Sequence, residues 1–191
     1  MAINDTILNQ SEPILRIDST LELINTCKNK TYEAKLEEFI YLDSNAYLLT
    51  ITSKDSGKIL SLDLPTGRTH IEKCGNNYIL LSSACGGPCS GLDFIFLKEK
   101  RPSESYMYCH IAKSNENIIT HVENEEFENL KIRNLKNGKE ITVHIDTCEN
   151  VSSYPCDITE IDISGSMLKI EFDSSERIPR QKQINIIEIL K

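Results

Sequence analysis

Residues 78–98 read YILLSSACGGPCSGLDFIFLK, and this stretch decides the fold class. An apolar run of strand length lies on each side of a short turn, CGGPC. Gly86 and Gly87 tolerate a positive φ and the following proline fixes the exit of the turn, so the stretch is predicted to form a β-hairpin. Cys85 and Cys89 are predicted to close this turn with a structural disulfide, because three intervening residues allow the required Cα separation. A reactive dithiol, or thiols that are free or metal-bound, are the alternatives.

Runs of the same kind recur along the chain. They alternate apolar and polar residues, follow one another at intervals of roughly 8–12 residues, and are separated by Gly, Pro, Asn and Asp. Asn137-Gly138 predicts a type I′ hairpin turn, and Ser56-Gly57 predicts a second hairpin. The pattern is typical of an all-β antiparallel sandwich or barrel-like fold.

The domain organisation is predicted from the polar N-terminal segment and from one charged stretch in the middle of the chain. We predict a flexible N-terminal segment, residues 1–16, and a single β-rich domain, residues 17–191, with at most one short N-terminal helix at residues 21–27. The charged stretch at residues 98–104 is the best candidate for a boundary, and we interpret it as a surface loop. The ten residues ILSLDLPTGR, 59–68, resemble the strand-turn unit of a β-propeller blade, but this pattern occurs once.

The chain is acidic. It has 29 Asp and Glu against 21 Lys and Arg, a formal net charge of −8. An acidic protein repels nucleic acid and attracts basic partners, so we expect a basic protein as partner and no nucleic acid. No run approaches the roughly 18 apolar residues of a membrane span, and we expect none.

Cysteine usage suggests an oxidising compartment. Seven cysteines are many for a cytosolic chain of this length, so we expect a periplasmic or secreted protein whose leader is absent from the chain as written, with the cytoplasm as the alternative. Cys148 and Cys156 are predicted to staple a loop, and Cys74 and Cys109 are candidates for a bridge between neighbouring strands. Cys27 is then the candidate for the unpaired thiol. Zinc bound by cysteines is the competing hypothesis.

Catalytic motifs are scarce. None of the four histidines lies in a recognised metalloprotease or Cys–His protease pattern, and no nucleotide-binding glycine motif occurs. No cofactor and no metal are expected. An enzyme site assembled in the fold from strand-end carboxylates and from His110 or His121 is an alternative, with hydrolysis of a sugar or peptide bond as the reaction class.

The function that fits these features is non-catalytic binding. We expect an exported immunity or inhibitor protein that blocks a basic hydrolase or toxin, with a hydrolase or a zinc or thiol protein as alternatives. The expected contacts are turn residues, acidic side chains, and two tyrosines that could act as aromatic anchors on one strand face. These candidates are Asn76, Asn77, Gly86, Gly87, Tyr106, Tyr108, Glu123, Glu125 and Glu126.

Overall fold

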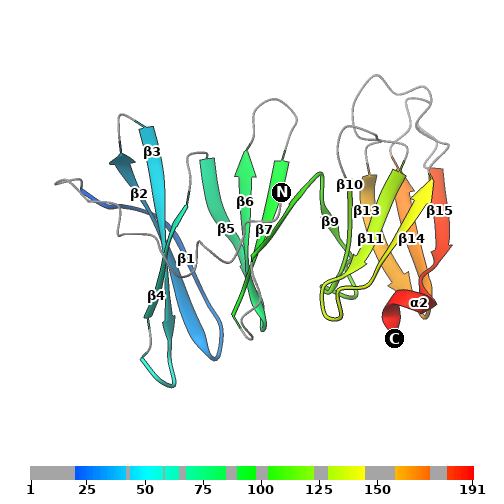
Figure 1. Ribbon diagram of the computed structural model, residues 1–191, viewed down its shortest axis with the longest axis horizontal. Coiled ribbons are helices and arrows are strands. Elements are labelled where there is room, and N and C mark those ends of the chain that lie inside the picture. Colours follow the sequence, from blue (N-terminus) through cyan, green and yellow to red (C-terminus); the bar gives the residue numbers. More distant parts are fainter. Residues whose placement is uncertain are drawn as a thin grey trace. The chain divides into compact units, whose positions relative to one another are not determined.

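The protein is all-β, with antiparallel sheets throughout, as the sequence predicts (Figure 1). The computed structural model describes residues 20–41, 44–57, 59–64, 68–84, 90–97, 103–122, 129–144, 158–172 and 180–191. Within these ranges the chain forms fifteen strands in four open sheets and one short helix. The chain divides into two compact units, unit 1 up to Ser105 and unit 2 from Tyr106, directly after the charged stretch at residues 98–104.

Unit 1 carries two four-stranded meanders. Sheet A contains β1 (Glu22–Lys28), β2 (Tyr32–Tyr41), β3 (Ser44–Ser53) and β4 (Ile59–Leu64), in that order. Sheet B contains β5 (Arg68–Cys74), β6 (Tyr78–Ala84), β7 (Ser90–Phe96) and β8 (Glu104–Met107), and the boundary between the units falls within β8.

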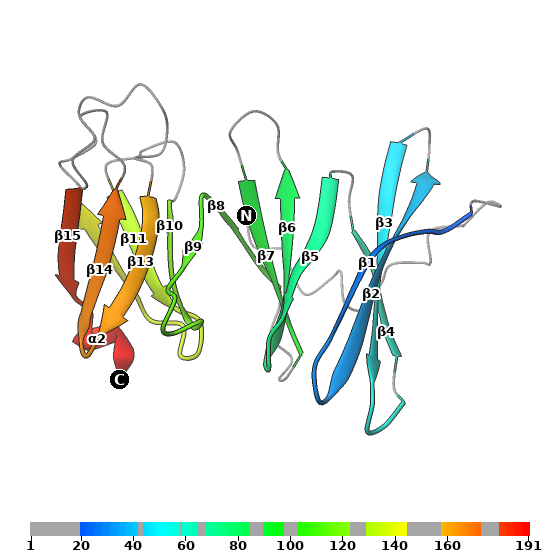
Figure 2. The ribbon, with the colours of Figure 1, turned by 180° about the vertical axis from the view of Figure 1, so that it is seen from behind.

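Unit 2 continues the same pattern (Figure 2). Sheet C contains β9 (His110–Ile111), β10 (Ile118–Val122), β11 (Asn129–Asn134) and β12 (Glu140–His144). Sheet D contains β13 (Ile158–Ser164), β14 (Met167–Phe172) and β15 (Arg180–Asn185), and the short helix α2 (Ile187–Leu190) follows.

Each of the four sheets is an antiparallel meander of consecutive strands, although the sequence shows no repeat. Their first strands begin at Glu22, Arg68, His110 and Ile158, so successive sheets start 46, 42 and 48 residues apart. Residues 59–68, whose pattern occurs once in the sequence, include β4, the last strand of sheet A, and end at the first residue of β5.

Each unit has its own hydrophobic core between its two sheets, because the strands that line it place apolar side chains on one face. In unit 1 the inward side chains of sheets A and B form one buried cluster, which comprises Tyr32, Ala34, Leu36, Tyr47, Leu49, Ile51, Ile71, Ile79, Leu81 and Ile95. In unit 2 the cluster joins sheets C and D with α2, and it comprises Ala112, Ile118, Val122, Leu130, Ile132, Ile158, Ile161, Leu168, Ile170, Phe172, Ile184, Ile186 and Ile189.

Several local predictions are confirmed and others are wrong. The hairpins at Ser56-Gly57 and Asn137-Gly138 form, but neither the serine nor the asparagine has a positive φ; only Gly57 and Gly138 do, at 64° and 73°. The second turn is therefore not type I′, which requires two such residues. The helix expected at residues 21–27 is instead β1, because pairing with β2 satisfies its backbone in an extended conformation.

Candidate functional site

Two of the four predicted binding residues of unit 1 share one turn. Asn76 and Asn77 are exposed between β5 and β6, immediately after Gly75. A Cβ at Gly75 would lie 3.1 Å from the Tyr78 carbonyl oxygen, so the chain reverses there in little space. Gly86 and Gly87 lie outside the described residues.

The two predicted tyrosine anchors do not share a strand face. The stretch at residues 105–112, expected to be one strand, is divided between β8 and β9, and Tyr108 lies between them with a φ of 51°. Tyr108 packs against the core of unit 2, whereas the ring of Tyr106 lies 4.5 Å from the imidazole of His121. Both side chains are half-buried, and each has a partner within unit 2.

The described cysteines pair differently from the prediction. Cys74 is bonded to Cys27, with a Cα–Cα distance of 5.7 Å, and Cys109 has no disulfide partner among the described residues. The reason is topological: β1 and β5 are edge strands of sheets A and B that lie side by side, whereas Cys109 falls in unit 2. The bridges proposed for Cys85–Cys89 and Cys148–Cys156 lie outside the described residues.

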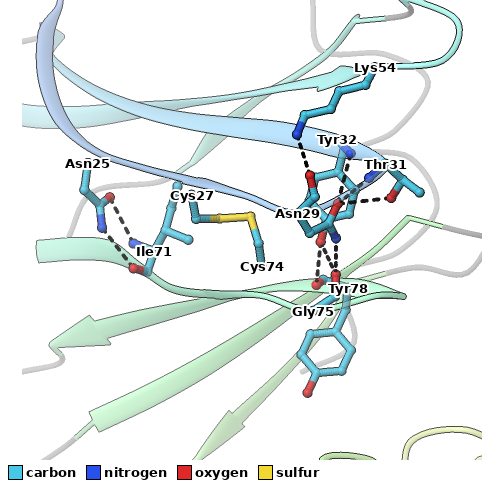
Figure 3. The surroundings of a disulfide bond; sticks show 10 residues. All are labelled: Asn25, Cys27, Asn29, Thr31, Tyr32, Lys54, Ile71, Cys74, Gly75 and Tyr78. Carbon is cyan, nitrogen blue, oxygen red and sulfur yellow. Dashed lines mark hydrogen bonds between the residues drawn. A yellow bond between two sulfur atoms is a disulfide. The ribbon is translucent and has the colours of Figure 1, made fainter.

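Polar side chains reinforce this bridge between the sheets (Figure 3). The Asn25 amide donates to the Ile71 carbonyl oxygen at 2.9 Å and accepts from the Ile71 N–H at 3.2 Å. These two bonds replace the pair of backbone hydrogen bonds that a neighbouring β-strand would make with Ile71. The Asn29 amide donates to the Gly75 carbonyl oxygen at 2.7 Å, and the buried Tyr32 hydroxyl lies against the same oxygen. The bridge and these bonds together fix the turn that carries Asn76 and Asn77.

Unit 2 holds a cluster of ionisable side chains that the sequence did not single out as a set. On the face of sheet C away from the core, His121 Nε2 lies 3.0 Å from Glu140 Oε2, and the Lys131 ammonium lies 3.2 Å from Glu140 Oε1. The Arg133 guanidinium is 3.6 Å from the same carboxylate. The signal was present in the sequence, because the Asn137-Gly138 hairpin places Arg133 opposite Glu140 in the register.

The protonation of this cluster follows from burial and hydrogen bonding. Burial lowers the pKa of His121; Glu140 opposes this shift through its hydrogen bond and charge, and the neighbouring cations favour it. Burial alone would raise the pKa of Glu140, but hydrogen bonds from His121 and Lys131 reverse the direction and lower it. Glu140 is therefore an ionised acceptor, so the neutral imidazole carries its proton on Nε2.

The chemistry available to this cluster is limited by access. His121 is only 7 % exposed, and Tyr106 covers one side of its ring. At His110 and Cys109, burial lowers the pKa of the imidazole and raises the pKa of the thiol well above its usual range. A buried thiol of this kind is a poor nucleophile, because the thiolate is the reactive form.

The topology of unit 2 separates its connections into two ends. The Asn137 amide donates to the Ile189 carbonyl oxygen, and the Ile186 N–H donates to the Ser166 carbonyl oxygen, so two hairpins lie beside α2. Ser114 bonds the end of β13 through its hydroxyl. The strands alternate in direction, so the other three connections of unit 2 start and finish at strand ends on the opposite side from α2 (Figure 1). These strand ends belong to β10, β11, β12, β13, β14 and β15.

Those three connections carry the acidic character of the chain. Residues 123–128, 145–157 and 173–179 have formal charges of −4, −3 and −1, which together equal the net charge of the whole protein. The rest of the chain has 20 acidic and 20 basic residues. Glu123, Glu125 and Glu126 belong to the first connection, and their own positions lie outside the described residues.

In comparisons with models of protein families, with curated proteins and with solved structures, nothing matches this chain. Among the described residues there is no group of three or more His, Cys, Asp and Glu side chains that could hold a metal ion. The same residues include no helix with the length and apolar character needed to cross a membrane.

Proposed function

We propose that this protein is an exported, non-catalytic binding protein that recognises a basic protein through the acidic end of unit 2. The observation that carries the proposal is the charge distribution: the entire net charge of −8 belongs to three connections whose flanking strands end on one side of one unit. A negative electrostatic field concentrated at one end of unit 2 attracts a cationic partner toward that end and raises its association rate.

Two further observations support the class of function. The Cys27–Cys74 bridge is typical of proteins from oxidising compartments. The His121 imidazole is buried and paired with the half-buried Glu140 carboxylate. An immunity or inhibitor protein that blocks a basic hydrolase or toxin has these properties, and we infer this role.

The test compares two variants of equal net charge. In the first, Glu123, Glu125 and Glu126 are replaced by Gln. In the second, three exposed carboxylates outside the acidic end, Glu33, Asp55 and Glu188, are replaced by Asn or Gln in the same way. Affinity is measured by calorimetry at two salt concentrations against a panel of basic hydrolases, a muramidase and a ribonuclease among them, together with their turnover.

We expect inhibition of at least one basic hydrolase, with an affinity that falls with salt. The first variant should bind about five- to thirtyfold more weakly, since three rim charges together contribute roughly 1–2 kcal/mol, and the control variant should bind like the parent. Equal losses in both variants, or no binding to any basic member of the panel, would refute the proposal.

Export has its own test. Protein produced without reductant in an oxidising compartment should show Cys27 and Cys74 resistant to alkylation in mass spectrometry, with Cys109 as a thiol that reacts only after denaturation. Alkylation of Cys27 and Cys74 in protein taken directly from its native cells would contradict export.

One arrangement favours a second candidate, a hydrolase. The Glu140 carboxylate orients a neutral His121, which is how a general base is prepared. If any of the hydrolase panel's substrates is turned over by the protein itself, His121→Gln should remove that turnover while leaving binding to basic proteins unchanged.

A further inference from the structure

The hairpin turn between β11 and β12 is fastened to the C-terminal helix by two side-chain amides. Asn134 Nδ2 donates to the Ile189 carbonyl oxygen at 2.8 Å, and Asn137 Nδ2 donates to the same oxygen at 3.0 Å. The Asn134 side chain is buried, and Ile189 belongs to the core of unit 2. The two amides therefore hold α2 at its end of unit 2 (Figure 2).

The same turn contains a dipeptide that is prone to chemical modification. Asparagine is a thermolabile residue, and Asn137-Gly138 is the one Asn-Gly pair of the chain. In such a pair the glycine nitrogen can attack the amide carbon of the preceding side chain, because glycine has no side chain of its own to hinder the approach. Both residues are exposed, so water and hydroxide can reach them.

The reaction at this pair would be deamidation. The Gly138 nitrogen gives its proton to hydroxide and forms a bond to Asn137 Cγ, the Cγ–Nδ2 bond breaks, and the side-chain nitrogen takes up a proton and leaves as ammonia. Water then opens the cyclic imide on one side or the other, which yields aspartate or isoaspartate. One water molecule is consumed and one ammonia is released, and no oxidant or reductant takes part.

The folded turn restrains every atom that this reaction needs. The Gly138 N–H donates to the Asn134 carbonyl oxygen at 2.8 Å, so the attacking nitrogen is engaged. Asn137 Oδ1 accepts from the Lys139 N–H at 3.0 Å, while Nδ2 is held by the Ile189 carbonyl oxygen. The turn must therefore open and separate from α2 before the amide can react.

The product cannot restore the contact with α2. An ionised carboxylate has acceptor oxygens only, so an oxygen would face the Ile189 carbonyl oxygen where the Asn137 NH2 group now donates. Repulsion between two acceptors replaces a hydrogen bond. In isoaspartate the main chain is also longer by one carbon atom, which changes the turn itself.

We propose that Asn137-Gly138 is a modification site, at which deamidation during transient opening of α2 prevents this helix from docking again on unit 2. The modification converts a reversible local opening into a permanent one. It does not depend on the proposed recognition of a basic partner, because α2 lies at the opposite end of unit 2 from the three acidic connections.

The first experiment ages the full chain in a mildly alkaline buffer, in which hydroxide deprotonates the attacking nitrogen. Peptide mapping by mass spectrometry measures conversion at position 137, and an isoaspartyl methyltransferase assay detects isoaspartate. We expect both products in the folded protein, formed more slowly than in the chain unfolded by urea. Equal rates in the folded and unfolded protein, or no conversion at position 137 in the folded protein, would overturn the proposal.

The second experiment asks whether opening of α2 controls the rate. Ile189→Val removes one methyl group from the helix, and Ile184→Val removes one from β15 in the same core cluster. Because an Ile→Val change in a core typically favours opening by a factor of roughly two to twelve, Ile189→Val should speed conversion by about this factor. The control Ile184→Val should leave the rate unchanged. Equal acceleration in both variants would show that global unfolding, and not release of α2, exposes the site.

The third experiment examines the product directly. Asn137→Asp should lower the urea midpoint and speed hydrogen exchange at the Ile189 and Leu190 N–H groups, which both donate to the Ile186 carbonyl oxygen. Asn115→Asp is the matched control, because Asn115 Oδ1 accepts from the Asn117 N–H at 3.1 Å and a carboxylate can do the same. Unchanged exchange in α2 of the Asn137→Asp variant, or equal effects in the two variants, would refute the release of the helix.

Discussion

Removing the Cys27–Cys74 bridge should cost the protein a large part of its stability. The bridge joins edge strands of two different sheets and closes a loop with a sequence separation of 47 residues. In the chain-entropy model a loop of this length corresponds to about 4 kcal/mol at 25 °C. Since both cysteines also pack against the core of unit 1, the loss of their sulfur atoms adds to this cost.

The perturbation is the double variant Cys27→Ala and Cys74→Ala, which leaves no unpaired thiol at either position to exchange with other cysteines. Urea unfolding is followed by far-UV circular dichroism, because the chain has no Trp. We expect a lower midpoint and a steeper denaturant dependence, because the unfolded chain expands without the crosslink, equivalent to a loss of about 4–5 kcal/mol. Cys109→Ala, which removes a free thiol from unit 2, is the control and should cost about 1 kcal/mol.

A loss below about 1 kcal/mol in the double variant would refute the reasoning, since it would show that the other contacts between β1 and β5 already hold the sheets together. Reductant separates this bridge from cysteines outside the described residues. It should lower the midpoint of the parent protein, and any further effect on the double variant reports those other cysteines.

Four smaller predictions concern single side chains. Asn25→Ala removes both hydrogen bonds to the Ile71 backbone and should destabilise the protein by about 1–3 kcal/mol in urea unfolding. Thr120→Val should raise the urea midpoint, by about 1 kcal/mol in stability, because the Thr120 hydroxyl is buried with no partner among the described residues. Gly138→Ala should cost about 1 kcal/mol in the same assay, since φ is 73° and the added methyl meets no atom of the described chain. Burial lowers the pKa of His121, so the unfolded chain binds a proton more readily; the unfolding free energy should fall as the pH drops below about 6.5, and His121→Gln should weaken this dependence.

The sequence predicts most strands of this protein because alternation is a local property. The runs around Tyr78–Ala84 and Ile118–Val122 show their period directly, and both form strands. Residues 21–27 have no such clear period, and their strand conformation depends on the backbone groups that β2 offers. The break at Tyr108 is likewise invisible to periodicity, because it arises where the chain passes from sheet B to sheet C.

Contacts between sheets were the hardest to predict. The cysteine adjacent in space to Cys74 is 47 residues away, and no local feature distinguishes it from Cys109. The Glu140 cluster was easier to predict than the disulfide, because the register of one hairpin places Glu140 opposite Arg133. The acidic end of unit 2 could be predicted from the sequence, because it follows from the alternation of strand direction and from the charges of three connections.

The bridge and the acidic end belong to different units, and this separation lets stability and recognition be distinguished. If recognition depends on Glu123, Glu125 and Glu126, loss of the bridge should reduce stability while leaving the affinity of the folded protein for a basic partner unchanged. The alternative contact surface is the turn at Asn76 and Asn77, which follows Cys74 by two and three residues and is held in place by the bridge. Loss of affinity on removal of the bridge, in variants that remain folded, would therefore locate the contact surface in unit 1.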